Sequence, residues 1–375
     1  MKFTCLQENL GSALSIAAPV ASKNASLPIL QNILLKTDEG GLTISATNLE
    51  IGVLAFVRGK TEEPGEITVQ ASLLAQFVNL LDADQVELIS DGTKLLVASG
   101  KQKTSIQGVD AVDFPVLPSI SGGVTVRVDR GALAEALASV SFSVVPNDIR
   151  PEIGGMFCSI GGGIMTLAGT DSYRLSERTL SVSGNAEHTT IIPLRTVQEL
   201  QRILSVAAAD APEVELLFTE NQLRAVAGST QLISRAIEGI YPAYREIIPK
   251  TTNTQCVVGR DALLKAIKRS SLFCSSGIND LSVKFTLPLE NNTQGIIELS
   301  ARNVQVGTHE EGLEAAITGK ENAAIFNWRY LADGLQHISS PEVIFELVDS
   351  SSPGILRPAS EGKREYTYLV MPIRQ

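Results

Sequence analysis

The sequence predicts an α+β protein of three repeated domains, each with two helices packed on β-sheets. The chain has 375 residues, which is longer than one ordinary domain. A short β-like run that leads into an amphipathic helix recurs along the chain, and alternating strand patterns follow these helices. Hydrophobic residues make up 44% of the chain and aromatic residues only 5%, so the cores must be mainly aliphatic.

The first half of each repeat is a short strand, a turn and a helix. These segments are "FTCLQENLGSALSIA" from Phe3, "VRVDRGALAEALASV" from Val126 and "CVVGRDALLKAIKRS" from Cys256. Apolar residues four positions apart give each helix one buried stripe. The stripes are Leu10/Leu14, Leu133/Leu137 and Leu263/Ile267.

The second half of each repeat follows the same design. Its segments are "ITVQASLLAQFVNLL" from Ile67, "IIPLRTVQELQRILS" from Ile191 and "AIFNWRYLADGLQHI" from Ala324. Strand patterns such as "VELISDGTKLLVAS" come after them, and Asp91-Gly92 in this stretch is typical of a hairpin turn.

Two linkers separate the repeats. Residues 117–123 and 248–254 are rich in Pro, Gly, Ser and Thr. We therefore predict domains at 1–120, 124–248 and 251–375. The domains close on "DFPVLP", "IYPAYREIIP" and "YLVMPIRQ", so the last strand of the third repeat is expected to end the chain.

Composition bounds the class of protein. The formal charge of −10 argues against a generally basic coat, although it leaves room for a local basic face. The four cysteines form no CxxC pair, so we expect buried, reduced thiols. The N-terminus lacks a signal-peptide pattern and no apolar run is long enough to span a bilayer, which predicts a cytoplasmic protein with no membrane partner.

Motifs for catalysis are missing from the sequence. It contains no phosphate loop and no GxSxG elbow, and the three glycines at 161–163 are typical of a hairpin turn. The three histidines are isolated, and no carboxylate pair suggests acid/base chemistry. We therefore expect no catalytic residue, cofactor or metal, and a role in binding or scaffolding.

Six motifs follow one another along the chain. They are "SLPILQNILL" from Ser26, "ATNLEIG" from Ala46, "RPEIGGMFCSI", "GTDSYRLS" from Gly169, "GIYPAYREIIP" and "FNWRYLADGL". In this order they resemble a known family, the bacterial DNA sliding clamp, which is the β subunit of DNA polymerase III. The start "MKFTCLQENL" and the terminal "YLVMPIRQ" are also similar to this family. The resemblance therefore extends along the whole chain.

The resemblance implies a structure and a function. Each domain would adopt the DNA-clamp fold, and each subunit would form half of a homodimeric ring with its helices lining the hole. Such a ring encircles double-stranded DNA as a replication processivity factor and slides without sequence specificity, which weak contacts to phosphates allow. Expected partners are the catalytic subunit of DNA polymerase III, the clamp loader, and other polymerases and repair factors that carry a clamp-binding peptide.

Basic helix faces opposite the core stripes are the expected DNA contacts, although an ordinary solvated face is the alternative for each helix. The first domain differs, because its exposed faces at 8–15 and 72–79 carry no Lys or Arg. The expected DNA-facing residues are Lys23 and Asn24 in the first domain, and Arg195, Gln198, Arg202, Lys265, Lys268 and Arg269 in the others.

A peptide pocket between the second and third domains is also implied by the resemblance. A methionine in its wall would adapt to several related peptides. The alternative is a purely structural role, in which these residues only fill the seam between domains. Glu246 and Gln375 depart from residues common in the family and could change peptide preference. The expected wall is Ile153, Thr170, Ser172, Tyr173, Arg174, Leu175, Pro242, Ile247, Asn327, Tyr330, Leu369, Met371, Pro372, Ile373 and Arg374.

The family places its subunit seam between the first domain of one subunit and the third domain of the other. Leu272 and Phe273 would form an apolar centre, although a buried helix end is a serious alternative for Phe273. Charged residues would face each other around this centre. They are Lys101 and Lys103 on one side and Glu310, Glu311 and Glu314 on the other.

Two other classes of protein stay open from the residues alone. An enzyme of inside-out repeated α/β architecture, such as an enolpyruvyl transferase, would need clustered Lys and Arg between strands, and the sequence contains no such cluster. A structural or adhesion repeat protein would predict a secretion signal and no basic helix faces.

Overall fold

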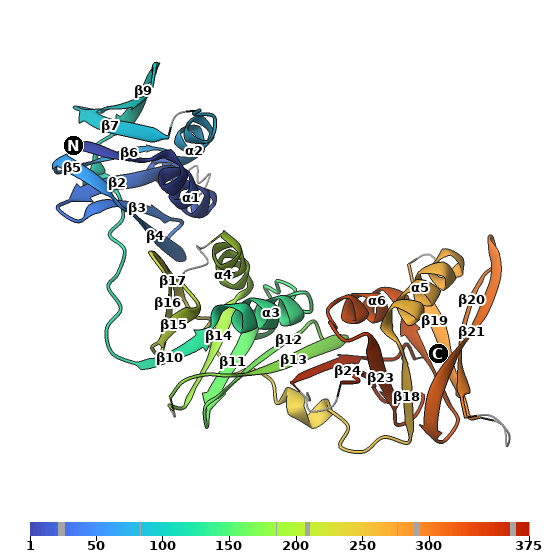
Figure 1. The fold of residues 1–375 in the computed structure, drawn as a ribbon. Helices are drawn as coiled ribbons and strands as arrows, with labels where there is room; N and C mark the ends of the chain where they lie inside the picture. The colour runs from blue at the N-terminus through green and yellow to red at the C-terminus, as the bar shows by residue number, and fades with distance from the viewer. Residues whose placement is uncertain are drawn as a thin grey trace. The chain divides into compact units, whose positions relative to one another are not determined.

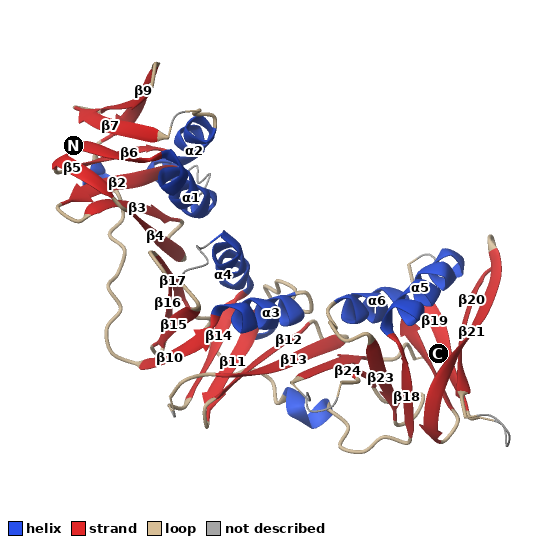
Figure 2. Ribbon diagram, in the orientation of Figure 1, coloured by secondary structure: helices blue, strands red, loops and turns tan. Residues whose placement is uncertain are grey.

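The computed structural model describes residues 1–21, 27–82, 84–184, 186–206, 211–275, 277–288, 293–360 and 365–374. Within these ranges the chain forms helices and antiparallel sheets (Figures 1 and 2). It separates into two compact units. Unit 1 contains Met1–Ala134, Ile160–Gly163 and Ser181–Glu238, and unit 2 contains Glu135–Ser159, Ile164–Leu180 and Gly239–Gln375.

One long sheet runs through unit 1, and its neighbouring strands are antiparallel. In sheet order its strands are β10 (Val124–Asp129), β15 (Glu213–Phe218), β16 (Gln222–Ala227), β17 (Thr230–Arg235), β4 (Ile51–Val57), β3 (Gly41–Thr47), β2 (Asn32–Asp38), β6 (Gly65–Gln70), β9 (Gln102–Val109), β8 (Lys94–Ser99), β7 (Gln85–Asp91), β1 (Lys2–Leu6) and β5 (Gly59–Glu63). The β17–β4 pairing joins the first repeat to the second.

Unit 1 also contains the helices α1 (Gln7–Ala17), α2 (Ala71–Asn79) and α4 (Leu194–Val206), and the strand β14 (His188–Pro193). Helices α1 and α2 lie side by side (Figure 1). The predicted stripe of Leu10 and Leu14 is buried, because these side chains face the sheet. Helix α3 (Arg130–Ser141) follows β10, and its predicted stripe of Leu133 and Leu137 is buried as well.

The second sheet places most strands of unit 2 in one antiparallel order. They are β11 (Gly155–Gly161), β12 (Ile164–Thr170), β13 (Arg174–Ser181), β25 (Tyr366–Val370), β24 (Gly354–Pro358), β23 (Glu342–Leu347), β18 (Thr254–Gly259), β21 (Gly307–Gly319), β20 (Gly295–Asn303), β19 (Asp280–Thr286) and β22 (Asn322–Asn327). Helices α5 (Arg260–Ser270) and α6 (Trp328–Gln336) pack on each other, and the Leu263/Ile267 stripe lies in the core.

The linker after the first repeat packs on the outside of the unit 1 junction. A Cβ placed on Gly52 would lie 2.5 Å from Cδ2 of Leu117, so the missing side chain of the glycine makes room for the leucine. Ile120 is buried in a small cluster with Leu217 and Ile233. The linker is therefore an ordered cover over this junction.

Two predicted turns and the predicted buried cysteines are confirmed. The β7–β8 hairpin turns at Gly92, directly after Asp91 at the end of β7, and Gly92 has φ 56°. The glycines at 161–163 end β11 and form its turn to β12. All four cysteines are free and buried, and burial raises the pKa of Cys5, Cys158 and Cys256 to about 12.

Among the described residues, no group of three or more His, Cys, Asp or Glu could hold a metal ion. No described helix is long and apolar enough to cross a membrane.

Candidate functional site

The candidate peptide site of unit 2 is built on the pairing of β13 with β25. Arg174 pairs with Val370, and Leu175 pairs with Leu369. Beyond β25, the amide of Met371 donates to the carbonyl of Tyr173 at 2.8 Å, and the amide of Ile373 donates to the carbonyl of Ile325 at 2.7 Å. The terminal segment is thus fixed to two strands, with the Met371, Pro372 and Ile373 side chains half-buried and Arg374 exposed.

A tight turn before β13 sets the direction of two predicted pocket residues. The Thr170 hydroxyl donates to the Arg174 carbonyl at 2.6 Å, and the Asp171 carboxylate accepts the amides of Tyr173 and Arg174 at 3.0 Å each. Ser172 adopts φ 75°, a conformation that non-glycine residues rarely take. The turn leaves Tyr173 63% exposed and sends the Arg174 side chain inward.

Arg174 is the most heavily bonded side chain of the candidate site. Its guanidinium donates to Asp333 Oδ2 at 2.6 Å, to Asp171 Oδ2 at 2.9 Å and to the Phe142 carbonyl at 3.0 Å. The same group lies 4.8 Å from the ring centroid of Tyr330, within cation–π range. Burial by itself would lower the Arg174 pKa, but Tyr368, Asp333 and Asp171 raise it above its ordinary value. We infer that Arg174 fixes the wall around it more than it offers charge to a ligand.

Aromatic side chains form the exposed rim. The Tyr173 and Tyr330 rings stack with centroids 6.4 Å apart, and the Tyr368 hydroxyl donates to the Tyr330 carbonyl at 2.9 Å. Asn327 caps α6, because its side-chain oxygen accepts the Arg329 amide at 3.0 Å. The cap positions the first turn of α6, which carries Tyr330.

The predicted pocket residues Pro242 and Ile247 lie in the segment before the third repeat, which has its own aromatic contacts. Tyr241 and Tyr244 pack on Phe157 with ring centroids 5.1 and 5.7 Å away, and the Tyr244 hydroxyl donates to Glu177 at 2.5 Å. Pro242 lies between these tyrosines in the chain and is half-buried. Ile247 is 49% exposed, Glu246 is exposed and Ile153 is buried.

The structure thus brings 170–175, Tyr330 and 369–373 together through direct contacts. Sequence reasoning missed Phe142, Asp333, His337 and Tyr368, which support them. His337 stacks on Phe142 at 3.9 Å, and its Nδ1 lies 2.8 Å from the Asp333 carbonyl oxygen. No pattern in the sequence links these residues to Arg174, because they come from distant helices and strands.

The predicted DNA-facing residues of unit 1 differ in what they contact. Arg195 and Gln198 on α4 are exposed and make no side-chain bond within the described chain. Arg202 instead donates to the Ser15 and Ile16 carbonyls at the end of α1, at 2.7 and 2.5 Å, and pairs with Glu199. Lys23 and Asn24 lie outside the described residues.

On α5 of unit 2, Lys265 and Lys268 are exposed without an ion pair among the described residues. Arg269 is paired with Glu311, with Nε 2.9 Å from Oε2. The hydrogen bond from Arg269 lowers the pKa of Glu311 below its ordinary value. A predicted DNA-facing residue and a predicted seam residue therefore neutralise each other within the subunit.

The predicted seam residues of unit 2 lie directly after α5 and on β21. Leu272 is 71% exposed, while Phe273 is half-buried and stacks on His309 with centroids 5.3 Å apart. Glu310 and Glu314 are exposed on one face of β21, and the less exposed Glu311 lies on the other. In unit 1, Lys101 and Lys103 are exposed in the β8–β9 hairpin.

A repeated fold of helices on antiparallel sheets, with exposed aromatic and apolar side chains beside β25, belongs to the class of proteins that bind other molecules. Three family descriptions match this chain. They are the N-terminal domain of the DNA polymerase III beta subunit at residues 1–118, its central domain at 127–243 and its C-terminal domain at 245–374. The chain belongs to the DNA polymerase III beta subunit family.

Relatives agree along the full length. The beta sliding clamp of Synechococcus elongatus is 28% identical over 100% of this chain and 99% of its own, and that of Pseudomonas putida is 28% identical over 100% of both. The crystal structure of the DNA polymerase III beta subunit from Pseudomonas aeruginosa covers 100% of both chains at 27% identity with a TM-score of 0.91. The chain is accordingly a sliding clamp of DNA replication, a non-catalytic processivity subunit, and the enolpyruvyl transferase alternative is not supported.

Proposed function

We propose that this chain works as a homodimeric ring of two three-domain subunits that encircles double-stranded DNA in the cytoplasm. The ring slides without sequence preference and tethers the DNA polymerase III catalytic subunit, the clamp loader, and other polymerases and repair factors. Its membership of the beta subunit family supports this proposal. A closed ring is held by topology, so weak, sequence-neutral contacts to phosphates suffice.

Partner binding rests on one observation above all, the fixed terminal segment of unit 2. Two backbone hydrogen bonds, from Met371 and Ile373, hold half-buried apolar side chains beside the exposed ring of Tyr173. An apolar peptide would bury these side chains at little ordering cost, because the segment is already positioned. The methionine would adapt to several partner sequences.

DNA contact, in this proposal, comes mainly from the cationic and polar side chains that have no described partner. These are Arg195 and Gln198 on α4 and Lys265 and Lys268 on α5. Arg202 and Arg269 would contribute less, because Arg202 is already paired with Glu199 and Arg269 with Glu311. Lys23 and Asn24 stay a prediction for the first domain.

The proposed seam places Leu272 at its apolar centre, with Phe273 beside it on His309. Glu311 faces Arg269 of its own subunit, so Glu310 and Glu314 are the better partners for Lys101 and Lys103 of the other subunit. Rim charges of this kind chiefly set encounter rate and register, whereas the apolar centre holds an interface together.

The pocket is tested by the double change Met371→Ala with Pro372→Ala, measured as affinity for an apolar clamp-binding peptide. We expect a loss of about tenfold or more, since anchors of this kind commonly contribute over 1.4 kcal/mol. Arg235→Ala is the matched control, because Arg235 ends β17 and its amide donates to the carbonyl of Glu50, as the amide of Met371 donates to that of Tyr173. This variant should leave peptide affinity unchanged. Unaltered affinity in the double variant would reject the pocket.

The ring is tested by retention on closed circular duplex DNA after it is loaded by a clamp loader. Linearising the circle should release the protein, and retention on linear DNA would mean a direct binder. Leu272→Ala with Phe273→Ala should yield folded monomers in sedimentation. A dimer that persists at low concentration would place the seam elsewhere.

A further inference from the structure

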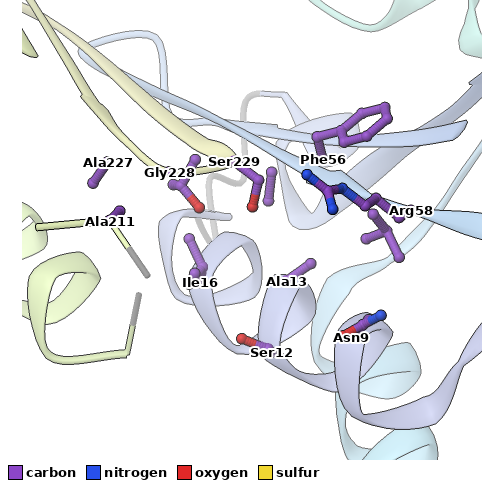
Figure 3. A pocket seen from close by; sticks show the side chains of 13 residues that line it. Asn9, Ser12, Ala13, Ile16, Phe56, Arg58, Ala211, Ala227, Gly228 and Ser229 are labelled. Carbon is purple, nitrogen blue, oxygen red and sulfur yellow. The ribbon is translucent and has the colours of Figure 1, made fainter. Parts of the chain in front are cut away.

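Unit 1 contains a pocket outside both the candidate peptide site and the predicted seam. It lies between α1, the end of β4 and the turn that joins β16 to β17, and its volume is about 600 Å³ (Figure 3). A volume of that size is in the range of small-ligand sites. Ile16 and Ala13 of α1 supply buried apolar surface to this pocket.

One cation and several hydrogen-bonding side chains line this pocket. Arg58 is the only charged residue among its described lining, and the guanidinium lies between Phe56 and Ser229 in Figure 3. The side chains of Arg58, Ser12, Asn9 and Ser229 make no hydrogen bond or ion pair to any described residue. Unpaired donors around a positively charged concave site favour an anionic ligand.

We propose that this pocket binds a phosphate group through Arg58, with Ser12, Asn9 and Ser229 as further donors. A guanidinium holds two oxygens of an oxyanion in its fork, and the hydroxyls and the amide would donate to the others. A carboxylate has only two oxygens, whereas a phosphate offers three or four for this number of donors. The apolar surface of Ile16 and Ala13 would pack against the remainder of the ligand.

Two sources could present the same phosphate chemistry, a free phosphorylated small molecule such as a nucleotide and the backbone of DNA. The DNA source rests on the proposed function of this chain, and it would give the first repeat a cation that its helix faces lack. The free source is independent of that function. Sequence reasoning missed Arg58 because it follows a strand, not the exposed face of a helix.

Calorimetric titration with inorganic phosphate and with dAMP tests the free source. Retention on circular duplex DNA over a range of salt concentrations tests the DNA source. Both use the full-length wild-type protein, Arg58→Ala, Arg58→Lys and Ser12→Asp, which would pair Arg58 with a carboxylate. Arg235→Ala is the control, because Arg235 is an exposed arginine of the same unit without a described ion pair and outside the pocket. All these positions are exposed, so the variants should fold.

Loss of a charge-assisted contact should weaken phosphate or dAMP binding by about tenfold or more in Arg58→Ala and Ser12→Asp. Arg58→Lys should fall between them and the wild type because it lacks the fork. Binding of dAMP that depends on Arg58 supports the free source. If only DNA retention depends on Arg58, and Arg58→Ala lowers the slope of log affinity against log salt concentration by about one, the phosphate belongs to DNA. Equal behaviour of Arg58→Ala and Arg235→Ala in both assays would overturn the proposal, while wild-type retention reports on the ring independently.

Discussion

The junction of β17 with β4 in unit 1 and the junction of β25 with β13 in unit 2 share one hydrogen-bond plan. In unit 1 the amides of Arg235 and Ile237 donate to the carbonyls of Glu50 and Ile191, at 3.2 and 2.9 Å. In unit 2 the amides of Met371 and Ile373 occupy the same places. A turn that contains a residue in the left-handed conformation precedes β4 and β13. The residue is Leu49 at φ 77° before β4 and Ser172 at φ 75° before β13. The backbone of the two junctions is therefore a repeated framework.

Side chains make the two junctions different. Opposite Ile233, unit 1 has Gly52, and the linker residue Leu117 fills the space above it. Opposite Leu369, unit 2 has Leu175. The position of Tyr330, five residues after Ile325, corresponds in unit 1 to Thr196, which is buried and bonded to Ser234 at 2.6 Å. The comparison teaches that one framework can be covered by its own linker or can present exposed aromatic and apolar side chains.

Arg174→Ala should have the largest effect on stability and peptide affinity taken together, and should separate the two junctions. It leaves the Asp171 and Asp333 carboxylates without their cation, and we expect the free energy of unfolding to fall by about 3 kcal/mol. Peptide affinity should fall too, because Tyr330 loses its cation–π contact. Both quantities are measured, by urea denaturation and by peptide titration.

Ile51 occupies the matched position in unit 1, opposite Ser234, and is buried. Ile51→Ala should lower stability by about 2–5 kcal/mol through lost packing, yet leave peptide affinity unchanged. A fall in peptide affinity in this control would mean that the two junctions act together, and the comparison would fail.

Gly52→Leu should give the next largest effect, because it installs the unit 2 side chain in unit 1. The new Cβ would lie 2.5 Å from Leu117, so the linker must move, with a loss of about 1–3 kcal/mol in the free energy of unfolding. The double variant with Leu117→Ala should be more stable than Gly52→Leu alone. Thermal unfolding of the set measures this coupling, and simple additivity would show that Leu117 does not depend on Gly52.

Local patterns predicted much of the fold, and contacts between distant segments account for what they missed. The Leu263/Ile267 stripe and the turn after Asp91 each involve residues that are close together in the sequence, so spacing and turn chemistry identify them. The Arg202 contact with the Ser15 carbonyl spans almost 190 residues and changes how available that cation is. Nothing near Arg202 in the sequence indicates this partner.

The same contrast holds at the candidate sites. The family motifs named the wall at 170–175, but not Asp333 or Phe142, which fix it from other elements. The prediction of basic helix faces also missed Arg58, because its proposed role depends on the pocket that α1 and the β16–β17 turn form around it. Residue identity carries the chemistry, and only the folded chain shows which charges are already paired.

Arg202→Ala should have a smaller effect, on unit 1. The guanidinium binds the last carbonyls of α1, where the helix dipole is negative, and we expect a loss of about 1 kcal/mol in the free energy of unfolding. Arg195→Ala on the same helix is the control and should leave stability unchanged, since Arg195 makes no described contact. Equal stabilities of the two variants would show that the Arg202 contact does not stabilise unit 1.

The smallest effect is expected from Glu311→Gln, seen as a change in pH dependence. Hydrogen bonding from Arg269 lowers the Glu311 pKa below its ordinary value of 4.5. A group with a depressed folded-state pKa adds stability above its unfolded pKa and loses it as pH falls through the folded value. The pair is partly exposed, so solvent screening keeps its contribution small.

Denaturation at pH 7 and at pH values below about 4 should therefore show a stability gap between wild type and Glu311→Gln that narrows in acid. Glu314→Gln, exposed on the other face of β21, should show no such narrowing. If both variants follow the wild type in parallel, the contact with Arg269 contributes nothing in solution, and Glu311 returns as a candidate partner for the lysines of the seam.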